Sequence, residues 1–263
     1  MLVHVVADYG QGDLAFAEVA QRLLLQLPKA QLVYTAVPPF ATLAAGFCVA
    51  QLALNESPSQ MAVFQNVAPR GDDRSARRDN DGERLVCARL ADGKLVVGPN
   101  SGFAFSFVRE AASELHFVKV SSGGSQFRSR DIFAWAFGRI VAGDRTLLGD
   151  PVPDAAVPPV PRDSIAYVDG YGNLKTTLGH AGLQPGETVP VRIGEVERTA
   201  LVAGGGFDVP DGELAFAPGS SGWPLPDGSS VRFRELFLRG GNAWAAFGRP
   251  PVGSRIALGV VSS

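Results

Sequence analysis

The sequence predicts an α/β N-terminal domain with a mostly parallel sheet, followed by a C-terminal all-β barrel. Strand-like and helix-like patterns alternate through residues 1–148, which is typical of α/β layers. Five prolines then follow between Pro151 and Pro161, and such a run is extended and semi-rigid. Beyond it, short strand-like pieces are separated by glycine-rich turns, as in small barrels and sandwiches. We therefore predict domains at 1–148 and 164–263, joined by a proline-rich linker at 149–163.

In the first domain, the apolar run at residues 2–8 predicts a short buried strand. Residues 12–28 carry apolar side chains at helical spacing, and Pro28 ends that helix. Residues 40–54 are rich in small apolar side chains and predict a second helix. The same periodicities predict further strands at 30–37, 60–68, 83–90, 94–100 and 115–120, and further helices at 103–113 and 130–142.

The second domain shows no helical periodicity of comparable length. Its strand-like segments are bounded by glycine, aspartate and asparagine, which favour turns. We predict strands at 164–170, 173–178, 188–194, 198–204, 231–240 and 254–261.

Composition excludes several classes of function. The chain has 263 residues, of which 46% are hydrophobic and 19% charged, and its net charge is -2. Without a positive field it has no means of holding nucleic acid. No apolar run approaches the roughly 20 residues of a membrane span, and the N-terminus lacks the pattern of a signal peptide. We expect a cytoplasmic protein with no nucleic-acid or membrane partner.

The two cysteines, Cys48 and Cys87, each lie inside an apolar run. Such positions are typical of core thiols rather than of a disulfide framework or a cysteine-rich metal site. We therefore expect no metal and no cofactor.

The segment 69–84 is rich in charge but nearly neutral. It holds five arginines at 70, 74, 77, 78 and 84 against five acids at 72, 73, 79, 81 and 83. A solvated loop is one interpretation and an active-site lid is the other.

Several polar positions are candidates for a ligand site. Asp8 ends the first strand, where open parallel sheets bind ligands, although it could equally be a turn residue. The turn at 98–102 contains Asn100 and leads into the next predicted helix. Asp13 could form a carboxylate pair with Asp8, but its spacing is more typical of a loop acid.

Two glycine-rich segments of the second domain are further candidates. Asp169, Tyr171 and Asn173 alternate, so an extended chain would place them on one side. The backbone of Gly240, Gly241 and Asn242 could approach a ligand closely. Each segment could also be a plain turn.

The order of these segments resembles the family of S-adenosylmethionine hydroxide adenosyltransferases, fluorinase and chlorinase. The family's "TDFG" or "SDLG" appears as "ADYG" at 7–10, and its "PDNG" or "PNNG" as "PNSG" at 99–102. Its "TFHGRDIFAP" or "TFYSRE" appears as "QFRSRDIFAW" at 126–135. Its "DRFGNLVTN" appears as "DGYGNLKTT" at 169–177, and its "NGGSA" as "RGGNA" at 239–243. The resemblance covers nearly the whole chain in collinear order.

The resemblance implies a homotrimer that binds a small nucleoside ligand between one subunit's N-domain and a neighbour's barrel. It implies that Asp8 holds the ribose hydroxyls and that Phe40 packs on the ligand. Ser129 falls where fluorinase has its halide-binding serine. The ligand-contacting residues carried over from the family motifs are Asn100, Asp169, Tyr171, Asn173, Gly241 and Asn242.

The sequence departs from the family at its catalytic base. The hydrolases activate water with an Asp, an Arg and a His, and the Asp and His positions are Ala68 and Arg128 here. Arginine has a pKa above about 12 and cannot act as a base near neutral pH. Arg77, or its neighbour Arg78, matches the family arginine if the loop carries an insertion.

The charge of Arg128 also affects whether the site favours a cationic or an anionic ligand. Two positive charges about 4 Å apart repel by about 4 kcal/mol at an effective dielectric near 20, so an inward Arg128 disfavours a sulfonium and favours an anion. Three interpretations remain open. The chain is an S-adenosylmethionine-cleaving enzyme with its nucleophile held by Arg128 and Ser129, an inactive member that still binds a nucleoside, or a scaffold without the pocket.

Overall fold

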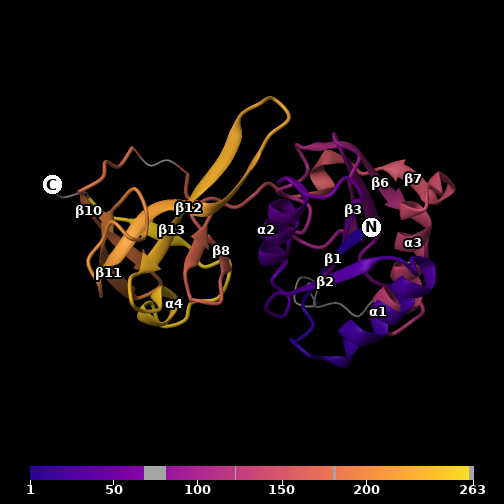
Figure 1. The fold of residues 1–263 in the computed structure, drawn as a ribbon, viewed down its shortest axis with the longest axis horizontal. Coiled ribbons are helices and arrows are strands. Elements are labelled where there is room, and N and C mark those ends of the chain that lie inside the picture. The colour runs from indigo at the N-terminus through magenta and orange to yellow at the C-terminus, as the bar shows by residue number, and fades with distance from the viewer. Residues whose placement is uncertain (68–80, 122, 180–181, 261–263) are drawn as a thin grey trace. The chain divides into compact units, whose positions relative to one another are not determined.

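The computed structural model describes residues 1–67, 81–121, 123–179 and 182–260, and the chain divides into two compact units. The first unit spans Met1–Pro159 and the second Val160–Ser263, so the division lies inside the proline-rich segment. Within the described residues, each unit is built on one mixed sheet of seven strands (Figure 1).

The first sheet has the strand order β2-β1-β3-β5-β4-β6-β7. The first four of these strands are mutually parallel, whereas β4, β6 and β7 join antiparallel. The strands are β1 (Leu2–Ala7), β2 (Gln31–Ala36), β3 (Met61–Asn66), β4 (Leu85–Leu90), β5 (Leu95–Pro99), β6 (Ala112–Val118) and β7 (Leu148–Pro151). The expectation of a mostly parallel sheet holds for four of the seven strands. The other three differ because β4 and β5 are joined by a short turn, and only antiparallel neighbours can be joined so closely.

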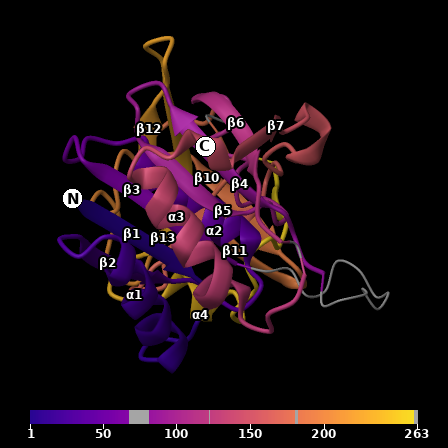
Figure 2. The same ribbon diagram turned by 90° about the vertical axis from the view of Figure 1, so that its right-hand side faces the viewer.

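Helices cover both faces of this sheet. The helices are α1 (Leu14–Gln26), α2 (Thr42–Ala53) and α3 (Ala134–Val141). Phe16, Leu23 and Phe137 place α1 and α3 in the same buried cluster as the sheet residue Phe64, and α2 lies on the opposite side (Figures 1 and 2). Short 3-10 turns, η3 (Arg145–Leu147) and η4 (Asp154–Ala156), flank β7.

The predicted helix at 103–113 is absent. The chain forms successive turns there, with bonds such as Ser106 N to Phe103 O and Val108 N to Phe105 O. Its apolar residues are buried in this irregular form, and the Phe103 carbonyl lies against Gly46 of α2, where a Cβ would overlap it. Tertiary packing has overridden the helical pattern.

The predicted helix at 130–142 begins one residue earlier, as the π-helical turn η2 (Ser129–Phe133), and continues as α3. π turns inside helices are rare and frequent at functional sites.

The second sheet has the order β14-β10-β11-β12-β13-β9-β8 and is nearly barrel-shaped. A bridge between Ser164 and Arg255, beside β8 and β14, links its two ends. Its strands are β8 (Ile165–Val168), β9 (Leu174–Thr176), β10 (Thr188–Ile193), β11 (Val196–Val202), β12 (Leu214–Pro224), β13 (Ser230–Leu238) and β14 (Ile256–Leu258).

Two elements of this unit escaped prediction: β12, and the one-turn helix α4 (Ala243–Ala246). A proline followed by glycine and serine residues interrupts the apolar pattern of β12, and a register shift between Pro218 and Gly222 absorbs them. The β12–β13 hairpin projects beyond the other strands of its unit (Figure 1).

Both cysteines are free and buried, as predicted. Burial raises the pKa of Cys48 to about 12 and that of Cys87 to about 11. Among the described helices, none is both long and apolar enough to cross a membrane.

Candidate functional site

The candidate site of the first unit lies where β1 and β3 end side by side. Strands β2 and β3 flank β1 on opposite sides, so the order of the strands reverses at β1. Open α/β sheets bind ligands at the carboxyl ends of the strands at such a reversal. Ala7 pairs with Asn66 at these ends, which brings Asp8, Tyr9 and Asn66 to this edge.

Asp8 fixes the loop that carries Phe40. Its Oδ2 accepts a hydrogen bond of 3.0 Å from the Phe40 backbone N–H. Phe40 has a φ of 62° and is 51% exposed, a conformation that costs a non-glycine residue energy and clusters at functional sites. Asp13 caps α1 by accepting from Ala15 N at 2.7 Å.

A second group of contacts joins Tyr9, Ser129 and Asn66, which we call the Tyr9 cluster. The hydroxyls of Tyr9 and Ser129 are 2.6 Å apart, and Asn66 Nδ2 donates to the Tyr9 hydroxyl at 2.9 Å. The Tyr9 ring packs edge-on against Phe16 and Phe127. Ser129 is only 4% exposed, so these three polar groups satisfy one another in a largely dry setting.

Burial raises the pKa of Tyr9, an effect that its hydrogen bond to Ser129 opposes and the Asp8 charge reinforces. The phenol therefore stays protonated near neutral pH. It can hold Ser129 in place by a hydrogen bond, but it cannot remove a proton from water there.

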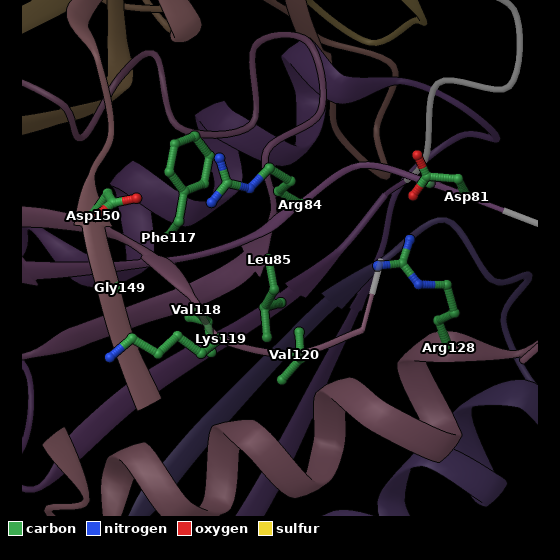
Figure 3. A pocket seen from close by; sticks show the side chains of 11 residues that line it. Asp81, Arg84, Leu85, Phe117, Val118, Lys119, Val120, Arg128, Gly149 and Asp150 are labelled. Atoms are coloured by element: carbon green, nitrogen blue, oxygen red, sulfur yellow. The ribbon is translucent and has the colours of Figure 1, made fainter. Parts of the chain in front are cut away.

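Arg128 turns to a different environment from its neighbour Ser129. Its guanidinium lines a pocket of about 370 Å³ together with Asp81, Arg84, Phe117, Lys119 and Asp150 (Figure 3). Burial lowers the pKa of Arg128, whereas the charges of Asp81 and Glu83 raise it. The guanidinium is nonetheless charged, and it places a cation in this pocket.

Asn100 ties the turn after β5 to the chain beyond β7. Its backbone N–H donates to Arg84 O at 2.9 Å, and its Nδ2 donates to Ala156 O at 2.8 Å. Its Oδ1 is buried without a partner among the described residues. The amide nitrogen thus has a structural role, and the oxygen remains available for a donor.

In the second unit, Asp169 organises the turn between β8 and β9. Its carboxylate accepts from the backbone N–H groups of Tyr171 and Asn173, both at 3.0 Å, and from Asn173 Nδ2 at 2.9 Å. Burial alone would raise the pKa of Asp169, but these hydrogen bonds and the charge of Lys175 lower it.

Of the two interpretations of Asp169, Tyr171 and Asn173, an extended chain or a turn, the structure shows the turn. The segment is a tight turn with Gly172 at a φ of 82°, not an extended strand. Tyr171 is therefore 82% exposed, whereas Asn173 is buried.

This turn lies against the loop that carries Gly241 and Asn242. Trp244 N donates to Gly172 O at 2.8 Å, and a Cβ on Gly172 would overlap the Asn242 side chain. Asn242 Oδ1 caps α4 by accepting from Ala245 N at 2.7 Å. The structure thus brings the two glycine-rich candidate segments of this unit together.

Arg77 and Ala68 lie outside the described residues, as does most of the charged segment 69–84. Sequence reasoning gave no role to Tyr9 or Asn66, although Tyr9 lies in the "ADYG" segment at 7–10 and Asn66 near the end of the predicted strand at 60–68. It also gave no role to Lys119 or Arg84, which it placed only in predicted strands and in the charged segment 69–84.

Neither a family model nor a curated protein matches this chain. Solved structures do resemble it. An uncharacterized conserved protein from Thermotoga maritima is 20% identical over 98% of this chain and 100% of its own, with a TM-score of 0.76. A conserved hypothetical protein from Thermus thermophilus is 24% identical over 97% of this chain and 98% of its own, with a TM-score of 0.66. At these identities the likeness concerns the fold alone.

Proposed function

We propose that the chain is an S-adenosylmethionine-cleaving enzyme of the hydroxide adenosyltransferase or halogenase type. It would yield adenosine or a 5'-haloadenosine plus L-methionine, with an α/β unit that binds the nucleoside and a β-barrel unit. The observation that carries this proposal is the contact between Tyr9 and Ser129, because it joins two of the segments on which the family resemblance rests. In the second unit, the close approach of Gly172 to the Asn242 side chain joins two more.

The proposed binding roles follow from the chemistry of the groups. The Asp8 carboxylate is an acceptor for two neighbouring ribose hydroxyls. Phe40 and Tyr171 are exposed aromatic side chains on loops, suited to stacking on a planar ring. Ser129 and Arg128 are the proposed contacts of the nucleophile, and Arg77 is the proposed family arginine. We propose a homotrimer, as in the family.

The proposed reaction is a displacement at C5'. The nucleophile forms a bond to C5' as the bond from C5' to sulfur breaks, and the electron pair stays on methionine, a neutral thioether. This step requires an in-line nucleophile that is positioned and stripped of water. Water would also have to lose a proton, and the Tyr9 phenol next to Ser129 cannot accept it. An anion such as chloride needs no base, which favours halide as nucleophile.

The test is to incubate purified protein with S-adenosylmethionine, with chloride or with sulfate, and to follow adenosine, 5'-chloroadenosine and methionine by liquid chromatography with mass detection. Product in proportion to enzyme, lost in Asp8→Asn, supports the proposal. No product from folded protein contradicts it. Asp208→Asn, which changes an exposed carboxylate of the other unit, is the matched control.

The alternative is an inactive member that binds S-adenosylmethionine or adenosine without cleaving it. The direction of Arg128 favours it, since the guanidinium lines a separate pocket and leaves Ser129 to Tyr9. Equilibrium dialysis with labelled S-adenosylmethionine separates the two: retention without product indicates binding alone.

A further inference from the structure

We propose that the pocket beside Arg84 and Arg128 binds a small monocarboxylate with an apolar body. This site shares only Arg128 with the proposed function and involves neither Asp8 nor Ser129, so its ligand goes beyond that function. The pocket lies in the first unit, over β4 and β6 and next to β7, and its volume is about 370 Å³ (Figure 3). That volume is at the lower end of the range of about 300–1,000 Å³ for small-molecule sites.

The charges around the pocket favour a single negative charge. Of the side chains that line the pocket, three are cations, Arg84, Lys119 and Arg128, and two are carboxylates, Asp81 and Asp150, which leaves one positive charge. Glu83, whose charge also acts on Arg128, does not line the pocket. A dianion such as inorganic phosphate would exceed that charge and meet the two carboxylates. A carboxylate matches it, and guanidinium groups bind carboxylates through two parallel hydrogen bonds.

Arg84 presents one such group. Its guanidinium carbon lies 3.4 Å from the centre of the Phe117 ring, which holds the planar group against an apolar face. Among the described residues, no side-chain hydrogen bond or salt bridge engages this guanidinium. Its donors are therefore held in place yet open to a ligand.

Arg128 presents a second group at another side of the pocket (Figure 3). One of its nitrogens donates to Ser121 O at 3.3 Å, and its guanidinium carbon lies 4.7 Å from the centre of the Phe133 ring. Its Nε is buried without a partner in the described part of the chain. A partly buried cation with an unmet buried donor is costly, and a bound anion would offset that cost.

Apart from the charged side chains and two glycines, the lining is apolar. Leu85, Val118 and Val120 line the pocket beside the charged groups (Figure 3), and Val120 is only partly buried. These side chains offer no polar partner to a ligand. They suit the hydrocarbon part of a carboxylate such as 3-phenylpropanoate rather than a small inorganic ion.

Gly82 allows a variant that moves Arg128 without changing charge. A Cβ built on Gly82 would overlap an Arg128 guanidinium nitrogen. The far end of an arginine side chain can shift cheaply, so Gly82→Ala should fold while displacing the guanidinium from its place in the pocket.

The test is isothermal titration calorimetry of 3-phenylpropanoate, 3-phenylpropanamide and inorganic phosphate with the full chain. We expect the carboxylate to bind at least tenfold more tightly than the amide or phosphate. Arg84→Gln and Arg128→Gln should each weaken it about tenfold or more, and Gly82→Ala should weaken it several-fold. Arg192→Gln, which changes an exposed arginine of the second unit, is the matched control and should bind as wild type.

Three results would overturn the proposal: no binding of the carboxylate, equal binding of the amide, or wild-type affinity in both arginine variants. Binding of phosphate alone would also contradict it, because the ligand class would be wrong. If circular dichroism shows that either arginine variant is unfolded, Gly82→Ala decides, and wild-type affinity in that variant counts against the site.

Discussion

Ser129 and Arg128 are neighbours in sequence, yet their side chains lie in opposite kinds of environment. Ser129 belongs to the Tyr9 cluster, an uncharged group in which Tyr9 is hydrogen-bonded to both Ser129 and Asn66. Arg128 lines a charged pocket and keeps one nitrogen unmet. The comparison shows how one loop can combine a rigid polar anchor with a cation held ready for a ligand. A closed network stabilises the fold, whereas an unmet charge costs stability until something binds.

Removing the Tyr9 hydroxyl should have the largest effect on stability, because it takes away the group that Ser129 and Asn66 share. Tyr9→Phe would leave Ser129 and Asn66 without their shared partner in a buried setting. We expect the free energy of unfolding to fall by about 1–3 kcal/mol, measured by urea denaturation. Tyr34→Phe is the matched control: Tyr34 is 47% exposed and also packs on Phe16, so its change should stay within about 0.5 kcal/mol. Equal stabilities of the two variants would show that the cluster contributes nothing.

Removing the Arg128 charge should have a smaller effect. Arg128→Gln loses the contact with the Phe133 ring, worth about 0.5–1 kcal/mol, but it also removes a partly buried cation with an unmet donor. The two changes oppose each other, so we expect stability to change by less than about 1 kcal/mol. The same urea titration measures it. A loss of several kcal/mol would mean that Arg128 belongs to a structural ion pair instead.

The smallest expected effect on stability concerns Asp131, which lies in the π-helical turn η2 with Ser129 and follows Arg128. This effect depends on pH. Hydrogen bonds from Arg130 and Ser125 lower the pKa of Asp131 to about 2. Because the folded pKa is below that of the unfolded chain, about 3.9, Asp131 stabilises the fold above that value, and this contribution is lost as the pH falls through about 2. The melting temperature of wild type should therefore exceed that of Asp131→Asn at pH 5 and converge with it as the pH falls through about 2.

The exposed acid Asp208 provides the control for that comparison. Asp208→Asn should follow wild type across the same pH range. A constant difference between wild type and Asp131→Asn down to pH 2 would show that Asp131 acts through packing rather than through its charge.

The sequence predicted the parallel half of the first sheet well, because buried strands and amphipathic helices have distinct periods there. It could not predict how β4, β6 and β7 pair, since a strand pattern does not state direction. Residues 103–113 were predicted as a helix because apolar spacing alone does not exclude a series of buried turns. β12 escaped because its glycines and prolines hide a strand that a register shift preserves.

The candidate site was predictable in its segments but not in its contacts. Asp8 and Ser129 could be proposed from the motifs around them. The hydrogen bond between Tyr9 and Ser129 spans 120 residues of sequence, and no local pattern reveals such a pairing. The direction of Arg128 was equally out of reach, because a long side chain can turn to either side of its loop.

The most direct test of displacement at C5' is to run the reaction with S-adenosylmethionine in ¹⁸O-labelled water containing chloride and to record product masses for wild type and Ser129→Ala. We expect wild type to form 5'-chloroadenosine, or adenosine carrying one ¹⁸O, together with unlabelled methionine. Ser129→Ala should form clearly less of either nucleoside. Adenosine without the label, or equal product from both proteins, would contradict it.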